Sequence, residues 1–149
     1  MAQMKDLSLN LPVSEAMVTH LVRLPPEATL EDAVEALLRT SQHEFPVVDA
    51  DDRILGVLTR DRLIAALKQR GSAVAVADVM QRDLPVVAAD DPFDKAFQLM
   101  QESAFPALPV VDRFGRLRGL ITPENVGELM MVNSLLPKGG RPSWRGSPS

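Results

Sequence analysis

The chain has 149 residues, a formal net charge of −4 at pH 7 and a hydrophobic content of 46%. Its sixteen Lys and Arg are scattered along the chain, which argues against nucleic acid as the main partner. No Cys is present and His20 and His43 are the only histidines, so disulfides, thiolate nucleophiles and a histidine-built metal site are excluded.

The N-terminal residues 1–11 have polar residues among the apolar ones, which is not the pattern of a signal peptide. No later stretch approaches the roughly 18 to 20 apolar residues that a membrane span requires. We therefore expect a soluble, cytoplasmic protein without direct membrane insertion.

The first predicted elements are a helical turn at residues 14–17 and an extended stretch at 21–24. A helix is expected from Thr29, because Thr29 and Asp32 have the spacing of a capping box and apolar residues recur on one face. A hairpin of residues 45–49 and 54–58 follows. Thr59 is then a suitable N-cap for a final helix.

The same order recurs further along the chain, because a shift of 63 residues aligns the sequence with itself. Eleven identities fall within the 55-residue window 13–67, against roughly three or four expected by chance. In the second copy, Asp91 is the predicted cap of the first helix, with Pro92 at its first position. Residues 108–112 and 117–121 form the predicted hairpin, and Thr122 the cap before Pro123. The pattern indicates an α+β fold made of two β-α-β-β-α repeats.

Two strings carry a family resemblance: FPVVDADDRILGVLTRDRL from residue 45 and LPVVDRFGRLRGLITPENV from residue 108. Both resemble the second half of a CBS domain, and two copies resemble a tandem CBS pair, or Bateman module. The repeats are placed at 11–70 and 74–133. The resemblance implies that they pack about a pseudo-twofold axis and leave two clefts, which in many members hold an adenine nucleotide or S-adenosylmethionine. It also implies a regulatory homodimer, not an enzyme, with no required cofactor and an unidentified regulated protein.

The resemblance places the ligand-binding residues on the first hairpin strand of each repeat and around each threonine cap. They are Phe45, Pro46, Val47, Thr59, Arg60, Arg62, Leu108, Pro109, Val110, Thr122 and Asn125.

The two clefts are expected to differ. In nucleotide-binding members an Asp three positions after the threonine holds the ribose, whereas this chain has Arg62 and Asn125 there. Asp61 is one place early and is expected to miss the cleft, since one residue is about 100° of helix rotation. Arg60 and Arg62 make the first cleft anion-friendly. The second has Pro123, which lacks an N–H, and Glu124, so its expected polarity is neutral to acidic and the first cleft is favoured.

Other patterns are assigned no catalytic role. His43-Glu44 starts like a zinc-binding HExxH motif, but the fifth residue is Val47 and the segment enters a strand. Residues 137–149 are rich in Pro, Gly and Ser and are predicted to be a disordered tail. The string GLITPENVGELMMV, which ends at Val132, resembles the CBS tail of bacterial site-2-type membrane metalloproteases.

Two functions from different classes remain open: a sensor of an adenine-containing ligand, and a ligand-free dimerisation or partner-binding module. A dimer interface is expected on apolar stripes of the two final helices. The stripes are Leu63, Ile64 and Leu67 on one helix, and Val126, Leu129 and Met130 on the other.

Overall fold

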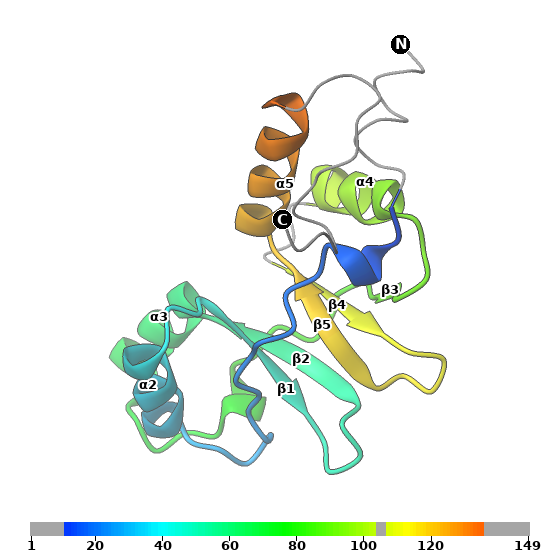
Figure 1. Cartoon of the computed structure of the whole chain (residues 1–149). Coiled ribbons are helices and arrows are strands. Elements are labelled where there is room, and N and C mark those ends of the chain that lie inside the picture. The colour runs from blue at the N-terminus through cyan, green and yellow to red at the C-terminus, as the bar shows by residue number, and fades with distance from the viewer. Residues whose placement is uncertain (1–10, 104–106, 136–149) are drawn as a thin grey trace.

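The computed structural model describes residues 11–103 and 107–135 (Figure 1). The predicted tail lies outside these residues. The helices are α2 (Leu30–Arg39), α3 (Arg60–Arg70), α4 (Phe93–Ser103) and α5 (Pro123–Leu135), and the 3₁₀ turns are η1 (Val13–Glu15) and η2 (Val76–Asp78). The strands are β1 (Glu44–Val48), β2 (Ile54–Thr59), β3 (Val87–Ala88), β4 (Leu108–Val111) and β5 (Leu117–Ile121). Within the described ranges, no helix is both long enough and apolar enough to span a bilayer.

Each repeat contributes one antiparallel hairpin. β1 pairs with β2 from Glu44–Thr59 to Val48–Ile54, β4 pairs with β5 in the equivalent register, and β3 lies parallel to β4. In the first repeat the strand equivalent to β3 is reduced to a single parallel bridge between Leu24 and Val47. Pro25 and Pro26 follow immediately, and prolines have no N–H to extend the pairing. The β-α-β-β-α order is thus present twice, with a short first strand.

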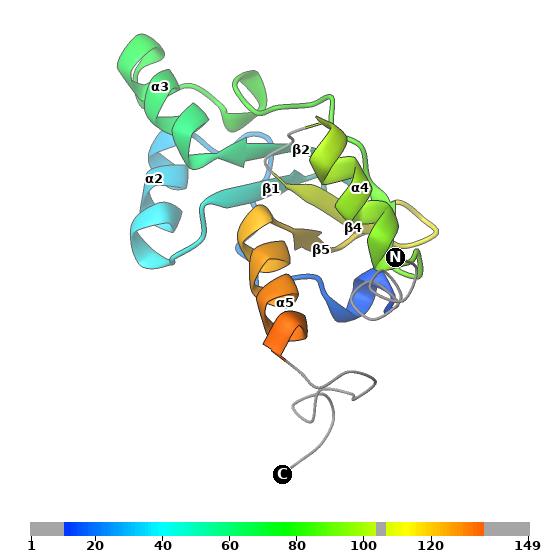
Figure 2. The ribbon, with the colours of Figure 1, turned by 90° about the horizontal axis from the view of Figure 1, so that it is seen from above.

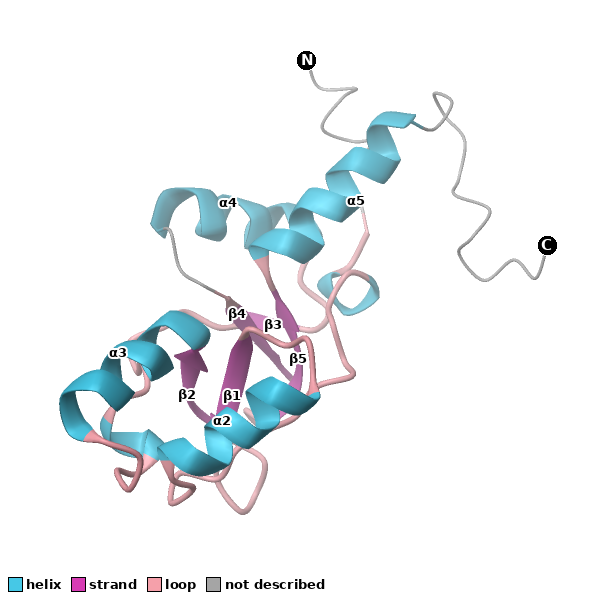
Figure 3. Cartoon of the chain, turned by 90° about the vertical axis from the view of Figure 1, so that its left-hand side faces the viewer, coloured by secondary structure: helices cyan, strands magenta, loops and turns pink. Residues whose placement is uncertain are grey.

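The molecule has two lobes, with helices on the outside and the two sheets facing each other between them (Figures 1 and 3). The first lobe packs α2 and α3 on β1 and β2. The second packs α4 and α5 on β3, β4 and β5. Figure 2 shows the same two sheets from above. Each lobe has its own core: the first is built around Leu30, Phe45, Leu58 and Leu63, and the second around Phe93, Leu108, Ile121 and Val126.

The lobes do not coincide with the sequence repeats, because the two repeats exchange their first turns. Val13 of η1 belongs to the second core and donates its N–H to the Asp91 carbonyl at 2.8 Å. Val76 of η2 belongs to the first core and donates to the Ala28 carbonyl at 2.7 Å. The two donors, Val13 and Val76, are 63 residues apart, and so are the two acceptors, Ala28 and Asp91. The exchange therefore follows the pseudo-twofold relation between the repeats. The chain must therefore cross between lobes after each turn.

Both crossings run against the opposite hairpin. Val18 and Leu120 exchange backbone hydrogen bonds of 2.8 and 3.0 Å, and Val57 and Gln81 do the same at 3.0 and 2.9 Å. The hairpin residue beside each crossing is a glycine, Gly119 or Gly56. A Cβ at Gly119 would lie 2.6 Å from the Val18 carbonyl oxygen, and one at Gly56 2.7 Å from the Gln81 carbonyl oxygen. Only glycine allows this backbone approach.

The predicted threonine caps are confirmed. Thr29 and Asp32 form the capping box, while Thr59 Oγ1 accepts from the Arg62 N–H and Thr122 Oγ1 from the Asn125 N–H. The prediction for Asp91 was wrong.

Asp91 does not cap the first turn of α4. Its carboxylate accepts the Ala88 N–H at 2.9 Å and pairs with Lys95 at 3.1 Å. Pro92 offers no N–H and that of Phe93 goes to the Leu11 carbonyl, so Asp91 turns back to the strand. The Ala88 hydrogen bond and Lys95 together lower the pKa of Asp91.

The predicted dimer stripes lie largely inside the monomer. Leu63 has no exposed surface and Val126 is also buried, while Leu67, Leu129 and Met130 pack against the same cores. Assigning Leu63 and Val126 to an interface between copies was therefore wrong, because each helix turns its apolar face to its own sheet.

Candidate functional site

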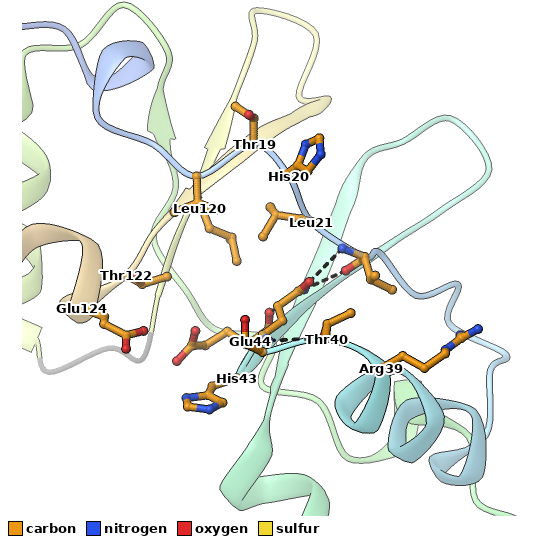
Figure 4. Close-up of a pocket in the computed structure, with 14 residues that line it drawn as sticks. Thr19, His20, Leu21, Arg39, Thr40, His43, Glu44, Leu120, Thr122 and Glu124 are labelled. Carbon is orange, nitrogen blue, oxygen red and sulfur yellow. Dashed lines mark hydrogen bonds between the residues drawn. The ribbon is translucent and has the colours of Figure 1, made fainter. Parts of the chain in front are cut away.

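A cavity of about 770 Å³ opens at the junction of the two lobes (Figure 4). It lies at the end of the sheets where β1 begins and β5 ends, the end opposite to the hairpin turns. Its lining residues are Val18, Thr19, His20, Leu21, Val22, Arg39, Thr40, Ser41, Gln42, His43, Glu44, Leu120, Thr122 and Glu124. We call this cavity the Thr122 cleft.

Three segments build the cleft. Residues 18–22 are the crossing strand, which the Val18–Leu120 hydrogen bonds hold against β5. Residues 39–44 lead from the end of α2 into β1. Thr122 and Glu124 come from the start of α5, in the other lobe. Both lobes are therefore needed to form the cleft, and a molecule bound there contacts both.

Gln42 joins two of these walls. Its Oε1 accepts the Val22 N–H at 2.9 Å, and its Nε2 donates to the carbonyls of Val22 and Glu44, both at 2.9 Å. One side chain thus bonds to three backbone groups at the edge of the cleft. Gln42 fixes the crossing strand at the distance from β1 that the cleft requires.

We expect Gln42→Ala to lower the free energy of unfolding by about 1 kcal/mol, because the three backbone groups are only half-buried and water can replace part of the lost bonding. Urea denaturation measures the change. Gln69→Ala is the matched control, since Gln69 is exposed on α3 and should change stability by less than about 0.5 kcal/mol. Equal effects of the two substitutions would show that the Gln42 bonds do not hold the crossing strand.

At the start of α5, the predicted ligand-binding residue Asn125 is not among the side chains that line the cleft. Glu124, two positions after the threonine, lines the cleft, whereas Asn125 donates its Nδ2 to the Ala16 carbonyl at 2.7 Å. Asp61, the residue of the first repeat equivalent to Glu124, was expected to miss the first cleft, and that expectation stays a prediction. Asn125, three positions after Thr122, therefore bonds to the segment that leads into the crossing strand. Arg62, three positions after Thr59, makes the equivalent bond in the first lobe, where its Nε donates to the Val79 carbonyl at 2.6 Å.

Two carboxylates give the cleft its charge. Figure 4 shows Glu44 and Glu124 pointing toward each other from the two lobes. Burial raises the pKa of Glu44, the nearby charge of Glu124 raises it further, and His43 opposes the shift. This agrees with the acidic character expected from Glu124, and Glu44 adds to it.

Thr122 is the one predicted ligand-binding residue that lines the Thr122 cleft. Phe45, Val47, Leu108 and Val110 are fully buried in the two cores. Pro46 and Pro109 are buried in β1 and β4, and Thr59 caps α3 beside the exposed Arg60. The cleft related by the 63-residue shift would include residues 104–106, which lie outside the described residues.

Most of the residues that line the cleft were not predicted from the sequence. Residues 40–43 form a loop, and loops have no periodicity from which a buried face can be recognised. A usable signal was present in the polar run Ser41-Gln-His-Glu44 directly before an apolar strand. The pseudo-twofold relation places the start of that strand opposite the start of the other repeat's final helix.

The family model for the CBS domain matches residues 13–69 and 76–131. The chain belongs to the CBS-domain family. It has two CBS domains in tandem, and like other CBS pairs it is a regulatory module. This CBS pair forms the Thr122 cleft between its two domains.

Known CBS proteins resemble the chain over most of its length. Inosine-5′-monophosphate dehydrogenase of Methanocaldococcus jannaschii is 29% identical over 112 residues, which are 75% of this chain and 22% of that enzyme. The crystal structure of CBSX2 from Arabidopsis thaliana in complex with AMP is 27% identical, with a TM-score of 0.73, and the match covers 84% of this chain and 99% of CBSX2.

The CBS domain pair of protein MJ0100, in complex with 5′-methylthioadenosine and S-adenosyl-L-methionine, is 21% identical with a TM-score of 0.75, covering 83% and 98% of the two chains. It shares the fold. The chain spans less than half the length of the first curated relatives, at 22%, 24% and 44%.

Proposed function

We propose that this CBS pair senses an adenine-containing ligand, which binds in the Thr122 cleft between the two lobes. The observation that carries the proposal is the cleft itself, whose volume of about 770 Å³ falls within the usual range for small-molecule sites. The AMP complex of CBSX2, at 27% identity, supports an adenine compound as the ligand class.

The lining suits a nucleoside. Val18 and Leu21 offer an apolar wall for a base, and the Thr122 hydroxyl and the Glu124 carboxylate offer hydrogen bonds to sugar hydroxyls. The Val22 N–H and carbonyl are bonded to Gln42 and hold the crossing strand at the edge of the cleft. The equivalent of Val22 in the second repeat is Pro85, which has no N–H for such a bond. This difference favours the Thr122 cleft over the cleft beside Thr59 that the arginines suggested.

A ligand there has a route to regulation, because the cleft joins residues of both lobes. Binding would pull the start of α5 and the start of β1 toward the same molecule and change the angle between the lobes. We infer that the module regulates a partner protein or fused domain, since its relatives include longer enzymes. A homodimer, a cytoplasmic location and attachment to a site-2-type membrane metalloprotease remain predictions of the sequence.

A thermal-shift screen with AMP, ADP, ATP, S-adenosylmethionine and NAD tests the proposal. A ligand at a hundredfold excess over its dissociation constant should stabilise the fold by about 2.7 kcal/mol. Thr122→Val should reduce this ligand-induced shift. Thr59→Val is the matched control, because it removes the same kind of helix cap without touching the Thr122 cleft. Each variant is compared with its own ligand-free form, so the loss of about 1 kcal/mol from the cap itself cancels.

Two results would contradict the proposal. If none of these ligands raises the melting temperature at millimolar concentration, the CBS pair is a ligand-free dimerisation or partner-binding module instead. If Thr59→Val removes the shift and Thr122→Val does not, the ligand binds in the other cleft.

A further inference from the structure

The charges around the Thr122 cleft restrict which adenine compound can bind. Glu44 belongs to the first lobe and Glu124 to the second, and both line the cleft. Among residues 11–103 and 107–135, the ion pairs are Arg23–Asp52 and Lys95–Asp91, so neither cleft carboxylate is neutralised by a cationic side chain there.

The cationic and titratable residues of the lining do not cancel this charge. Arg39 lies at the end of α2 and points away from the two carboxylates in Figure 4. His20 lies on the crossing strand, while His43 is next to Glu44 and acts on its charge. Two carboxylates therefore face the space where a ligand would lie, with a single guanidinium at the far side.

The start of α5 is also poorly equipped to bind a phosphate. Pro123 has no N–H, and the Asn125 N–H is already donated to Thr122 Oγ1 at 3.1 Å. Helix N-termini bind anions through these first-turn N–H groups. Here a phosphate would meet few free donors and would lie beside the Glu124 carboxylate.

We propose that the Thr122 cleft selects an adenine nucleoside whose 5′ substituent carries a positive charge, such as a sulfonium, over one that carries a phosphate. The inference rests on the proposed function and specifies, in addition, the charge of the ligand's 5′ substituent. The cationic group lies between Glu44 and Glu124 and compensates both, which also draws the two lobes together. A nucleoside with an uncharged 5′ substituent binds with intermediate affinity, and a phosphorylated one is repelled.

Isothermal titration calorimetry with S-adenosylmethionine, 5′-methylthioadenosine and AMP tests this selectivity. Their 5′ substituents differ in charge, from cationic through neutral to anionic. The wild-type chain should bind S-adenosylmethionine about tenfold or more tighter than AMP, the effect of a charge interaction across a partly solvated gap. Glu124→Gln should weaken S-adenosylmethionine binding, strengthen AMP binding and so narrow the ratio.

Glu128→Gln is the matched control, because Glu128 is exposed one turn further along α5 and does not line the cleft. It should leave the ratio unchanged. Glu44→Gln provides a second variant from the other lobe, so that poor folding of one variant does not decide the result, and thermal melting of the free proteins checks both folds.

Each outcome decides the inference. If AMP binds as tightly as S-adenosylmethionine, or if Glu124→Gln does not narrow the ratio, the charge selectivity is wrong and the adenine-sensing function stands. If 5′-methylthioadenosine and S-adenosylmethionine bind with equal affinity, the two carboxylates do not recognise the positive charge of the ligand, and the inference is wrong. If no compound binds, the proposed function and the inference fall together.

Discussion

Leu63→Glu should abolish the folded state rather than dissociate a dimer. Leu63 has no exposed surface and lies in the first core, where α3 packs on β1 and β2. A carboxylate at this position would be buried without a cationic partner, which costs several kcal/mol. Natural domains have about 5 to 15 kcal/mol of stability in total. The circular dichroism spectrum and urea denaturation should show a largely unfolded or strongly destabilised chain at 25 °C.

The control is Leu38→Glu on α2. Leu38 is 79% exposed, so its replacement should change stability by less than about 0.5 kcal/mol. The opposite result would be a wild-type dimer and a Leu63→Glu chain that is folded but monomeric. That result would show that Leu63 lies in an interface between copies. It would contradict the packing of α3 described above.

Gly119→Ala should destabilise the CBS pair by about 1 to 3 kcal/mol and weaken ligand binding as well. The added Cβ would lie 2.6 Å from the Val18 carbonyl oxygen and 2.9 Å from the Met17 sulfur. The carbonyl cannot move alone, because Val18 and Leu120 are joined by two backbone hydrogen bonds. The crossing strand must therefore shift, and Val18 at its start lines the Thr122 cleft. Urea denaturation and ligand titration measure the two effects.

The same substitution at Gly127 should have the opposite sign. Gly127 lies within α5, and a Cβ there would meet nothing within 4 Å. Alanine at a helix position is favoured over glycine by about 0.5 to 1 kcal/mol, so Gly127→Ala should stabilise the fold. If Gly119→Ala is as well tolerated as Gly127→Ala, the two lobes do not meet at the Val18 crossing.

Local signals in the sequence predicted the hairpins and helix starts well. The threonine caps depend on side-chain bonds three residues away, and the hairpins on alternating apolar residues beside turn residues. Gly56 and Gly119 are one of the eleven identities between the two repeats, but their role in the crossings could be recognised only from the fold. Asp91 was wrongly predicted because its competing partner, the Ala88 N–H, lies outside the helix pattern.

Two features depended on tertiary packing and could not be predicted. The exchange of η1 and η2 between lobes leaves no local pattern, because a three-residue turn with one buried valine fits either core. The Thr122 cleft depends on that exchange, since it brings residues 18–22 to β5. The residues that line the cleft are therefore mostly those of a loop and a crossing strand, whereas the predicted strand residues Phe45, Val47, Leu108 and Val110 lie in the two cores.

The most direct test of the ligand site is amide hydrogen exchange of the chain with and without S-adenosylmethionine. The Thr122 cleft predicts slower exchange with ligand at residues 18–22, 40–44 and 124–126, which belong to both lobes. Residues 58–62 and 81–84, around the opposite cleft, should exchange at unchanged rates. Slower exchange only at residues 58–62 and 81–84 would contradict ligand sensing through the Thr122 cleft. So would unchanged exchange of the whole chain at a ligand concentration that saturates it.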